Sequence, residues 1–324
     1  MITFEEAWNQ IDEAEIPLIL LGNGFSQAWR HGVFNYANLF DKANFGTRDA
    51  EIKSIFEKIG TYDFEAVMRA LVSAKIVIES YDSASPLIAT IEADQEILKN
   101  SLLSAISNSH PELPHEVTDD QYINTRSFLS RFKQIFTVNY DLLMYWARNK
   151  RSLAPEDWRT DDGFRSGQLW EGYGTDQNVY FLHGALHIYD APNGIYKHSY
   201  KEQRGDSIVE QVKVNLAKNN FPLFVSEPTH EKKKKKIENN PYLNFCYRAL
   251  ESSSGTAFIY GHSLDENDKH IMDSLRKSDV EKIFISIYGD EDSADNLRIK
   301  ANANAYLGRG KSIVFFDAAT TPIW

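Results

Sequence analysis

The main constraint on how this chain folds is a set of seven short apolar runs. Helical patterns separate most of the later runs, so that strands and helices are predicted to alternate. The runs are rich in β-branched and aromatic residues and are nearly continuous in hydrophobicity, which is typical of strands covered on both faces of a sheet. They lie at 16–22, 134–140, 179–183, 222–227, 256–263, 282–289 and 312–317. Alternating strands and helices predict right-handed βαβ units, so we expect an α/β, Rossmann-like, doubly wound parallel sheet.

Residues 47–133 interrupt this alternation with an almost purely helical pattern. Four apolar residues there share one face of a predicted helix: Phe64, Val67, Met68 and Leu71. The chain returns to the sheet only at the run that starts at residue 134. We therefore expect a helical insertion at 47–133, after the first strand, within a single domain that spans 1–324.

Charge and cysteine content exclude several classes of protein. The formal net charge of -11 argues against a general nucleic-acid-binding surface, and the lysine run at 232–236 is typical of a solvated helical turn. The single cysteine, Cys246, excludes an intramolecular disulfide and a cysteine-based zinc site, so we expect a small buried side chain there. No apolar stretch approaches the roughly 20 residues of a membrane span. We expect a cytoplasmic protein with no membrane contact.

Two glycines follow the first predicted strand, at the strand end where ligands bind in open parallel sheets. Gly22, Asn23 and Gly24 stand directly behind the apolar residues of that run. Glycine permits a tight turn and lets main-chain N–H groups approach phosphate oxygens, so we expect a diphosphate beside this loop. Gln27 replaces the third glycine of the G-x-G-x-x-G fingerprint, which leaves a tight turn without a ligand as the alternative.

Polar residues also follow the second and third predicted strands. Thr137, Asn139 and Asp141 become exposed as the second strand turns into a helix, and a helix cap is an equally good interpretation of Asp141. His183 closes the third strand and precedes Gly184, so its imidazole is expected at the same edge of the sheet. A structural, hydrogen-bonded histidine is the alternative.

A second glycine turn follows the run at 256–263. Gly261 leaves the strand, and Ser263 with Glu266 matches an S-x-x-E capping box at the start of a helix. Such a helix N-terminus is able to receive an anion or a ribose hydroxyl. Capping alone also explains the serine.

Two further patterns do not support other chemistry. The stretch GRGKS at 308–312 resembles the end of a P-loop, but Ala305 replaces the required glycine, so we exclude ATP hydrolysis. His183 and His187 lie four apart on a strand, which separates them by roughly 13 Å. We therefore expect no metal site.

Taken in order, four stretches resemble the sirtuin-like NAD-binding superfamily over about residues 16–290. They are GNGFS for the family's G-A-G-x-S, TVNYD for T-x-N-x-D, HG for the catalytic histidine and its glycine, and YGHSL for G-T-S-L. The helical insertion is similar to a bacterial branch linked to phage defence, within which an uncharacterised bacterial family is nearest and AbiH is a more distant likeness. Asn23 departs from the family's alanine, and the cysteines of the deacylase zinc module are missing.

The resemblance implies that NAD is a substrate whose nicotinamide–ribose bond is cleaved. His183 would be the general base toward water or a ribose hydroxyl, and Asn139 would orient the ribose and the attacking water. Asp141 would hold the nicotinamide amide or the loop around it, and Asp290 would accept hydrogen bonds from the adenosine ribose. The implied NAD-binding residues are Gly22, Asn23, Gly24, Phe25, Ser26, Thr137, Asp141, Gly261, His262, Ser263 and Asp290.

These inferences predict an NAD hydrolase that releases nicotinamide and ADP-ribose and depletes NAD during phage infection. Three alternatives remain: an NAD-dependent lysine deacylase, a sensor that binds NAD or ADP-ribose without turnover, and an assembly subunit with a vestigial pocket. Uncontrolled hydrolysis would kill the cell. We therefore expect activity to depend on a trigger, through a homo-oligomer or a partner such as a HerA-type ATPase.

Overall fold

The computed structural model describes residues 1–30, 40–60, 62, 64–111, 113–165, 168–199, 207–217, 222–225, 227 and 229–324. Its centre is a six-stranded sheet in the order β3-β2-β1-β7-β8-β9, and each pair of neighbouring strands is parallel. The strands are β1 (Leu18–Leu21), β2 (Gln134–Thr137), β3 (Val179–Phe181), β7 (Ser254–Tyr260), β8 (Asp279–Ile287) and β9 (Ser312–Asp317). The predicted α/β, Rossmann-like parallel sheet is confirmed.

The strand order reverses at β1. β2 and β3 extend the sheet on one side of β1, whereas β7, β8 and β9 extend it on the other. Such a reversal leaves a crevice at the carboxyl ends of parallel strands, because the connections on its two sides leave toward opposite faces. The loops that follow Leu21, Thr137, Tyr260 and Ile287 therefore meet at one edge of the sheet.

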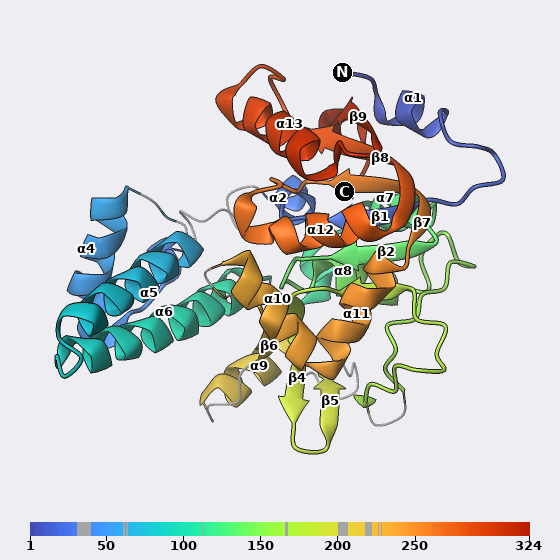
Figure 1. Ribbon diagram of the computed structural model, residues 1–324. Coiled ribbons are helices and arrows are strands. Elements are labelled where there is room, and N and C mark those ends of the chain that lie inside the picture. The colour runs from blue at the N-terminus through green and yellow to red at the C-terminus, as the bar shows by residue number, and fades with distance from the viewer. Residues whose placement is uncertain are drawn as a thin grey trace.

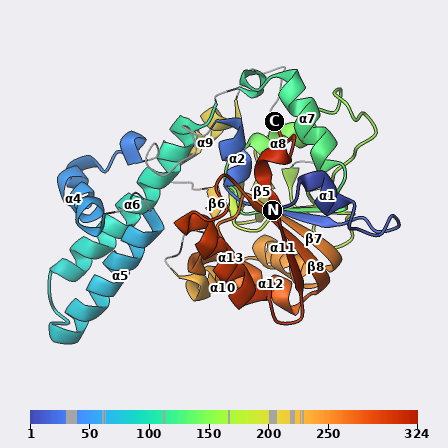
Figure 2. The same cartoon turned by 90° about the horizontal axis from the view of Figure 1, so that it is seen from above.

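Helices cover both faces of this sheet (Figure 1). They are α1 (Phe4–Trp8), α2 (Gly24–Trp29), α7 (Asp119–Leu129), α8 (Leu143–Asn149), α10 (His230–Asn239), α11 (Pro241–Glu251), α12 (Lys269–Lys277) and α13 (Ala294–Leu307). Figure 2 shows α10 to α13 on one side of the sheet and α1, α7 and α8 on the other. Within the described ranges, none of the helices has both the length and the apolar character that a bilayer crossing requires.

Aromatic packing holds the second of these layers to the sheet. The ring of Phe4 in α1 lies 5.3 Å from that of Phe128 in α7, 5.7 Å from Phe258 in β7 and 5.8 Å from Phe316 in β9, measured between centroids. On the opposite face, Cys246 of α11 is buried, as predicted. Burial of a large apolar side chain, such as each of these phenylalanines, contributes about 1.5–3 kcal/mol to the stability of the fold.

A helical segment fills the chain between β1 and β2. Its elements are η1 (Gly46–Arg48), α4 (Asp49–Ile59), α5 (Phe64–Tyr81), α6 (Leu87–Ser109) and η2 (Pro114–Glu116), followed by α7. α4, α5 and α6 project to one side of the sheet (Figures 1 and 2), while α7 returns to it. Phe64, Val67 and Leu71 of α5 are buried and Met68 is partly buried, so the predicted helical face is confirmed.

A smaller antiparallel sheet follows β3, with the order β5-β4-β6. It consists of β4 (Gly184–Ala191), β5 (Gly194–Lys197) and β6 (Pro222–Phe224). The expectation that the run at 222–227 belongs to the main sheet is wrong, because β6 pairs with β4. A buried ion pair network fixes this region: Asp162 lies 2.7 Å from both Arg148 of α8 and Lys197 of β5.

Candidate active site

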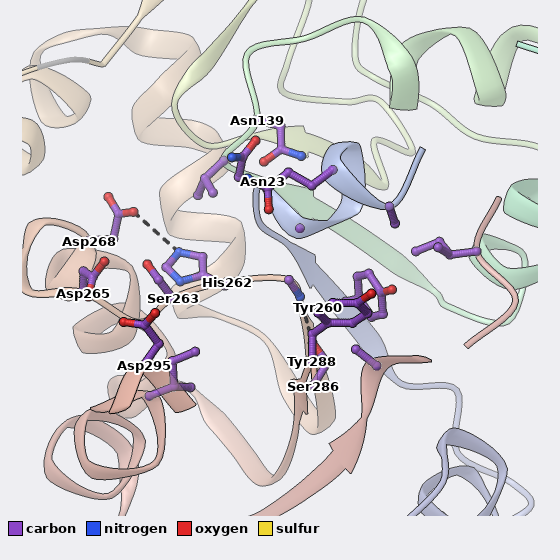
Figure 3. Close-up of a pocket in the computed structure, with 18 of the residues that line it drawn as sticks. Asn23, Asn139, Tyr260, His262, Ser263, Asp265, Asp268, Ser286, Tyr288 and Asp295 are labelled. Carbon is purple, nitrogen blue, oxygen red and sulfur yellow. Dashed lines mark hydrogen bonds and ion pairs between the residues drawn. The ribbon is translucent and has the colours of Figure 1, made fainter. Parts of the chain in front are cut away.

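A cavity of about 1080 Å³ lies at the carboxyl ends of β1, β2, β7 and β8, where the strand order reverses (Figure 3). Eight residues predicted from the sequence line it: Asn23, Gly24, Asn139, Asp141, His183, Gly261, His262 and Ser263. Five others do not: Gly22, Phe25, Ser26, Thr137 and Asp290. The structure therefore brings all four sequence stretches to one site, although some of their residues lie behind its surface.

The first glycine loop packs directly against the turn after β7. The N–H groups of Gly22 and Gly24 donate to the carbonyl oxygens of Tyr260 at 2.9 Å and Gly261 at 2.8 Å. A Cβ on Gly22 would lie 2.5 Å from the Gly261 oxygen, and one on Gly24 would lie 2.6 Å from the Gly261 Cα. The glycines are required by this approach of two backbones. The expectation that their N–H groups bind a diphosphate is wrong, because both already have carbonyl partners.

Ser26, Asn139 and Asp141 form a buried network beside the cavity. Nδ2 of Asn139 donates to the Gly22 oxygen at 2.9 Å and to Ser26 Oγ at 3.1 Å, and Ser26 Oγ donates to Asp141 Oδ2. A carbonyl only accepts, so the amide nitrogen of Asn139 must face Gly22 and its Oδ1 lies on the other side. Among the described residues, Oδ1 of Asn139 makes no hydrogen bond.

Asp141 also lies two residues before the start of α8. Its Oδ1 accepts from the N–H of Leu143, the first residue of α8, at 2.9 Å. Asp141 precedes the N-cap residue Leu142, which has no side-chain cap bond, so the cap left open by the sequence takes the form of this one bond to Leu143. Both carboxylate oxygens of Asp141 have partners within the protein. Burial raises the pKa of Asp141, although its hydrogen bonds with Ser26 and Leu143 act in the opposite direction.

Phe25 and Thr137 support the site from outside the cavity. Phe25 is fully buried, its ring lies 5.0 Å from that of Trp324, and its carbonyl accepts from Trp324 Nε1 at 2.7 Å. Thr137 Oγ1 accepts from the N–H of Asn139 at 3.0 Å. Both residues contact their neighbours and lie outside the cavity lining.

His183 lies between β3 and β4, and only 2% of its surface is exposed. Its Nε2 is 3.0 Å from Nε2 of His270, and the two rings are nearly parallel, at 18°. One proton lies between these nitrogens, so the two rings are opposite tautomers when both are neutral. Burial lowers the pKa of His183 to about 3, although Asp268 acts to raise it. The ring is therefore neutral at neutral pH.

An ion pair that the sequence did not indicate lies beside His183. Nζ of Lys233 is 3.0 Å from Oδ1 of Asp268, and Lys233 is only 1% exposed. Nε2 of His183 is 3.8 Å from the same oxygen, while Nε2 of His262 is 3.6 Å from Oδ2 (Figure 3). Burial acts to raise the pKa of Asp268, but Lys233 and the neighbouring histidines outweigh it and lower that pKa. Asp268 is thus ionised and shared among three partners.

The burial of Lys233 corrects the expectation of a solvated lysine run. Thr229 caps α10 by accepting from the N–H of Lys232, and Lys233 and Ile237 are the buried residues of this helix. These two residues are four apart and share one helical face. The apolar residue at that spacing is the signal that one lysine of the run faces inward.

His262 directs one ring nitrogen toward Asp268. Its Nδ1 accepts from the N–H of Leu264 at 2.9 Å, so the proton of the neutral ring is on Nε2. In the part of the chain that the structure describes, this Nε2 is buried and has no hydrogen-bond partner. Burial lowers the pKa of His262, although Asp268 acts to raise it.

Ser263 does not cap a helix, so the predicted capping box is wrong. The 3₁₀ helix η5 (Glu266–Asp268) begins three residues later and has Asp265 at its N-cap position. Leu264 has a φ of 53°, which turns the chain before any helix begins. Ser263 is left exposed at the lining of the cavity.

Asp290 is exposed and is not among the residues that line the cavity, so the structure gives no support to its predicted contact with the adenosine ribose. Its Oδ1 accepts from the N–H of Asp292 at 3.0 Å, and its carbonyl accepts from Asn296 Nδ2 at 2.7 Å. It shapes the turn before α13. Tyr288 and Asp295 line the cavity on this side instead.

Three side chains of the site are spaced closely enough to share a cation. The nearest ligand atoms of His183, Asp268 and His270 all lie within 4.8 Å of one another. Lys233 already places an ammonium 3.0 Å from the carboxylate of this group, and its positive charge opposes a second cation there. The expectation of no metal stays a prediction.

A family model described as a domain of unknown function, DUF4917, matches residues 19–324. The chain belongs to this family. No curated protein matches it. Two solved structures resemble it at 14% identity over 95% of this chain and 99% of theirs. One is described as "The Structural basis for Sirtuin Substrate affinity", with a TM-score of 0.36, and the other as "Structure of Sir2Tm bound to a propionylated peptide", with a TM-score of 0.35. A likeness of this low identity and TM-score assigns no role to any residue of the site.

Sequence reasoning missed several residues of the site in this DUF4917 protein, among them the three that lie around His183, namely Lys233, Asp268 and His270. Asp268 and His270 follow the second glycine turn closely, at the end of η5 and the start of α12. Charged residues at a helix start are ordinarily interpreted as caps, so they gave no separate signal. Their nearness to His183 became visible only in the folded chain.

Proposed function

We propose that the cavity binds NAD and that the protein hydrolyses the nicotinamide–ribose bond, releasing nicotinamide and ADP-ribose. The observation that carries this proposal is the position of His183 and Asn139, which line a cavity of about 1080 Å³ at the strand-order reversal. Nucleotides bind at this position in open α/β sheets. The ordered likeness of four sequence stretches to sirtuin-like NAD-binding proteins supports the same substrate.

The bond to nicotinamide breaks through an oxocarbenium-like state on the ribose, so the site must stabilise positive charge. Asn139 suits this task, because its amide nitrogen is held by Gly22 and Ser26 while its Oδ1 makes no hydrogen bond among the described residues. The negative end of the amide dipole is thereby fixed before the reaction, at no cost when the charge develops. The same oxygen is able to accept a hydrogen bond from the attacking water.

His183 receives the proton of that water. As the water oxygen bonds to the ribose carbon, the carbon–nitrogen bond breaks and its electron pair leaves with nicotinamide. The newly bonded oxygen carries a positive charge and is a far stronger acid than an imidazolium. A neutral imidazole whose pKa burial lowers to about 3 is therefore basic enough to accept the proton at this stage.

The phage-defence branch that the sequence resembles supports a cellular role for this reaction as depletion of NAD during infection. It also supports activation by assembly, either as a homo-oligomer or with a HerA-type ATPase. The deacylase alternative lacks support, because the single Cys246 cannot supply the zinc module of those enzymes.

The proposal is tested by measuring nicotinamide and ADP-ribose release from NAD at several protein concentrations. The wild type is compared with His183→Ala and with His115→Ala, which removes an exposed histidine away from the cavity. We expect His183→Ala to lose about 10²- to 10⁴-fold in rate, the usual contribution of a general base. His115→Ala is expected to retain the full rate, and a rate that rises steeply with concentration would indicate activation by assembly.

Three results separate the alternatives. Equal release by the wild type and His183→Ala would refute the role of His183. Equal binding of NAD by both proteins, with no release at any concentration, would favour the sensor. Release that requires an acyl-lysine peptide would favour the deacylase.

A further inference from the structure

The cavity presents more negative than positive charge to a ligand. Among the described residues that line it, four carry carboxylates: Asp141, Asp265, Asp268 and Asp295. Two have basic side chains: Lys233 and Arg298. A diphosphate brings two further negative charges, so a ligand of this class needs at least one of these cations as its partner.

Four backbone N–H groups of the first glycine loop already have partners within the protein. The N–H groups of Gly22 and Gly24 donate to the turn after β7, and those of Phe25 and Ser26 donate to the carbonyl oxygens of Gly22 and Asn23, both at 3.0 Å. α2 has only six residues, so its dipole offers little in addition. We therefore look for the partner of a diphosphate among the side chains that line the cavity.

Of the two cations, Lys233 is the one inside the site. It is 1% exposed, lines the cavity, and lies 3.0 Å from Asp268, which in turn contacts His183. Arg298 on α13 has 55% of its side chain exposed and lies 3.4 Å from Asp265 and 3.3 Å from Asp295. Solvent and salt screen the charge of a surface arginine, whereas they screen the charge of a buried lysine much less.

We propose that Lys233 binds the diphosphate of the ligand and that Asp268 holds this lysine in place while the cavity is empty. The inference rests on the proposed function, because it takes the ligand to be NAD or ADP-ribose. A buried ammonium without a counter-charge is costly, which gives Asp268 its role in the empty protein. The ligand then competes with Asp268 for Lys233.

Ligand binding also changes what Asp268 does. When Lys233 turns toward the diphosphate, the carboxylate is left to His183, 3.8 Å from Oδ1, and His262, 3.6 Å from Oδ2. His270, whose Nε2 is 3.0 Å from that of His183, completes the group of titratable side chains around this point. A carboxylate freed from its lysine favours a positive charge on His183, so occupancy of the phosphate position prepares the base for the proton that it receives.

The experiment measures the affinity of the full chain for ADP-ribose by titration calorimetry at low and high salt. Lys233→Met removes the charge and keeps the length of the side chain. Lys235→Met makes the same change at an exposed lysine of the same helix and is the matched control. Arg298→Met tests the competing cation, and Asp268→Asn removes the charge that holds Lys233.

We expect Lys233→Met to weaken ADP-ribose binding by about 10- to 100-fold and to reduce its salt dependence, as the loss of one charged hydrogen bond predicts. Lys235→Met and Arg298→Met are expected to stay within about threefold of the wild type. Asp268→Asn is expected to bind ADP-ribose about threefold or more tightly, because the competitor for Lys233 is gone, and yet to release nicotinamide more slowly.

The outcomes that overturn the inference differ from those that overturn the proposed function. A wild type that does not bind ADP-ribose refutes the NAD site, and this inference falls with it. If Arg298→Met weakens ADP-ribose binding and Lys233→Met leaves it unchanged, the diphosphate binds at the rim of the cavity instead. If Asp268→Asn weakens ADP-ribose binding, Asp268 contacts the ligand directly and does not compete with it for Lys233. This result refutes the inference even if Lys233→Met does not fold.

Discussion

Mild acid is expected to unfold this protein before most of its carboxylates are protonated, because six neutral histidines lie inside the fold, five of them buried and one half-buried. Burial is the main cause that lowers the pKa of each one. The pKa is lowered to about 4 for His110 and His198 and to about 3 for His183. It is also lowered for His187, His262 and His270.

The sign and size of the effect follow from proton uptake on unfolding. Below about pH 6.5 the unfolded chain protonates these groups while the folded protein does not, so stability falls as the pH falls through this window. One pH unit below 6.5 each of the three groups whose pKa is about 3 or 4 in the folded protein costs about 1.4 kcal/mol, and the three together cost about 4 kcal/mol, a large part of a typical total stability of about 5–15 kcal/mol. His187, His262 and His270 act in the same direction. Asp141, whose pKa is raised by burial, acts in the opposite direction but is a single group.

Urea unfolding between about pH 8 and pH 5.5 measures this loss. His187→Phe isolates one of the six groups, because His187 is fully buried, its ring lies 4.2 Å from that of Tyr145 and 4.9 Å from that of Phe181, and it lies outside the cavity lining. Any cost of the larger ring is the same at both pH values. The variant is expected to gain about 1.4 kcal/mol over the wild type between the two ends of the range.

His115→Ala, at an exposed position, is the control and is expected to follow the wild type throughout. A free energy of unfolding that stays level from pH 8 to pH 5.5 would refute the reasoning. So would an unchanged pH dependence in His187→Phe, because either result means that the folded protein takes up these protons as readily as the unfolded chain.

Two further substitutions test the packing around the site. Gly22→Ala is expected to cost at least about 3 kcal/mol, because its Cβ would meet the Gly261 oxygen at 2.5 Å, whereas Gly60→Ala strains only a left-handed φ in open space and costs about 1 kcal/mol. Equal losses in urea unfolding would contradict the close approach of the two backbones. Asp162→Asn is expected to cost about 3–5 kcal/mol, since it leaves the buried Arg148 and the half-buried Lys197 without their carboxylate. Exposed Asp157→Asn should change stability by less than about 0.5 kcal/mol, and thermal unfolding that ranks the two alike would contradict this assignment.

The sequence by itself determined the parallel sheet and the edge at which the site lies. Continuous apolar runs are buried on both faces only in a covered sheet, and parallel strands bring their carboxyl ends to the same edge. Asn139, His183 and Gly261 could therefore be assigned to one site without coordinates. The helical segment between β1 and β2 was equally clear, because its apolar residues recur with a helical period over a long stretch.

Only the tertiary structure decided which groups face the cavity and what they are bonded to. The pattern of apolar residues does not indicate which sheet a short strand joins, so β6 was wrongly expected in the main parallel sheet. The glycine pattern does not indicate whether Gly22 and Gly24 approach a phosphate or another backbone, because either kind of close approach requires a residue without a Cβ. Lys233 is the sharpest case. Whether a lysine in a run is solvated or buried depends on the charge that its helix packs against, and Asp268 meets it from a segment 35 residues away along the chain.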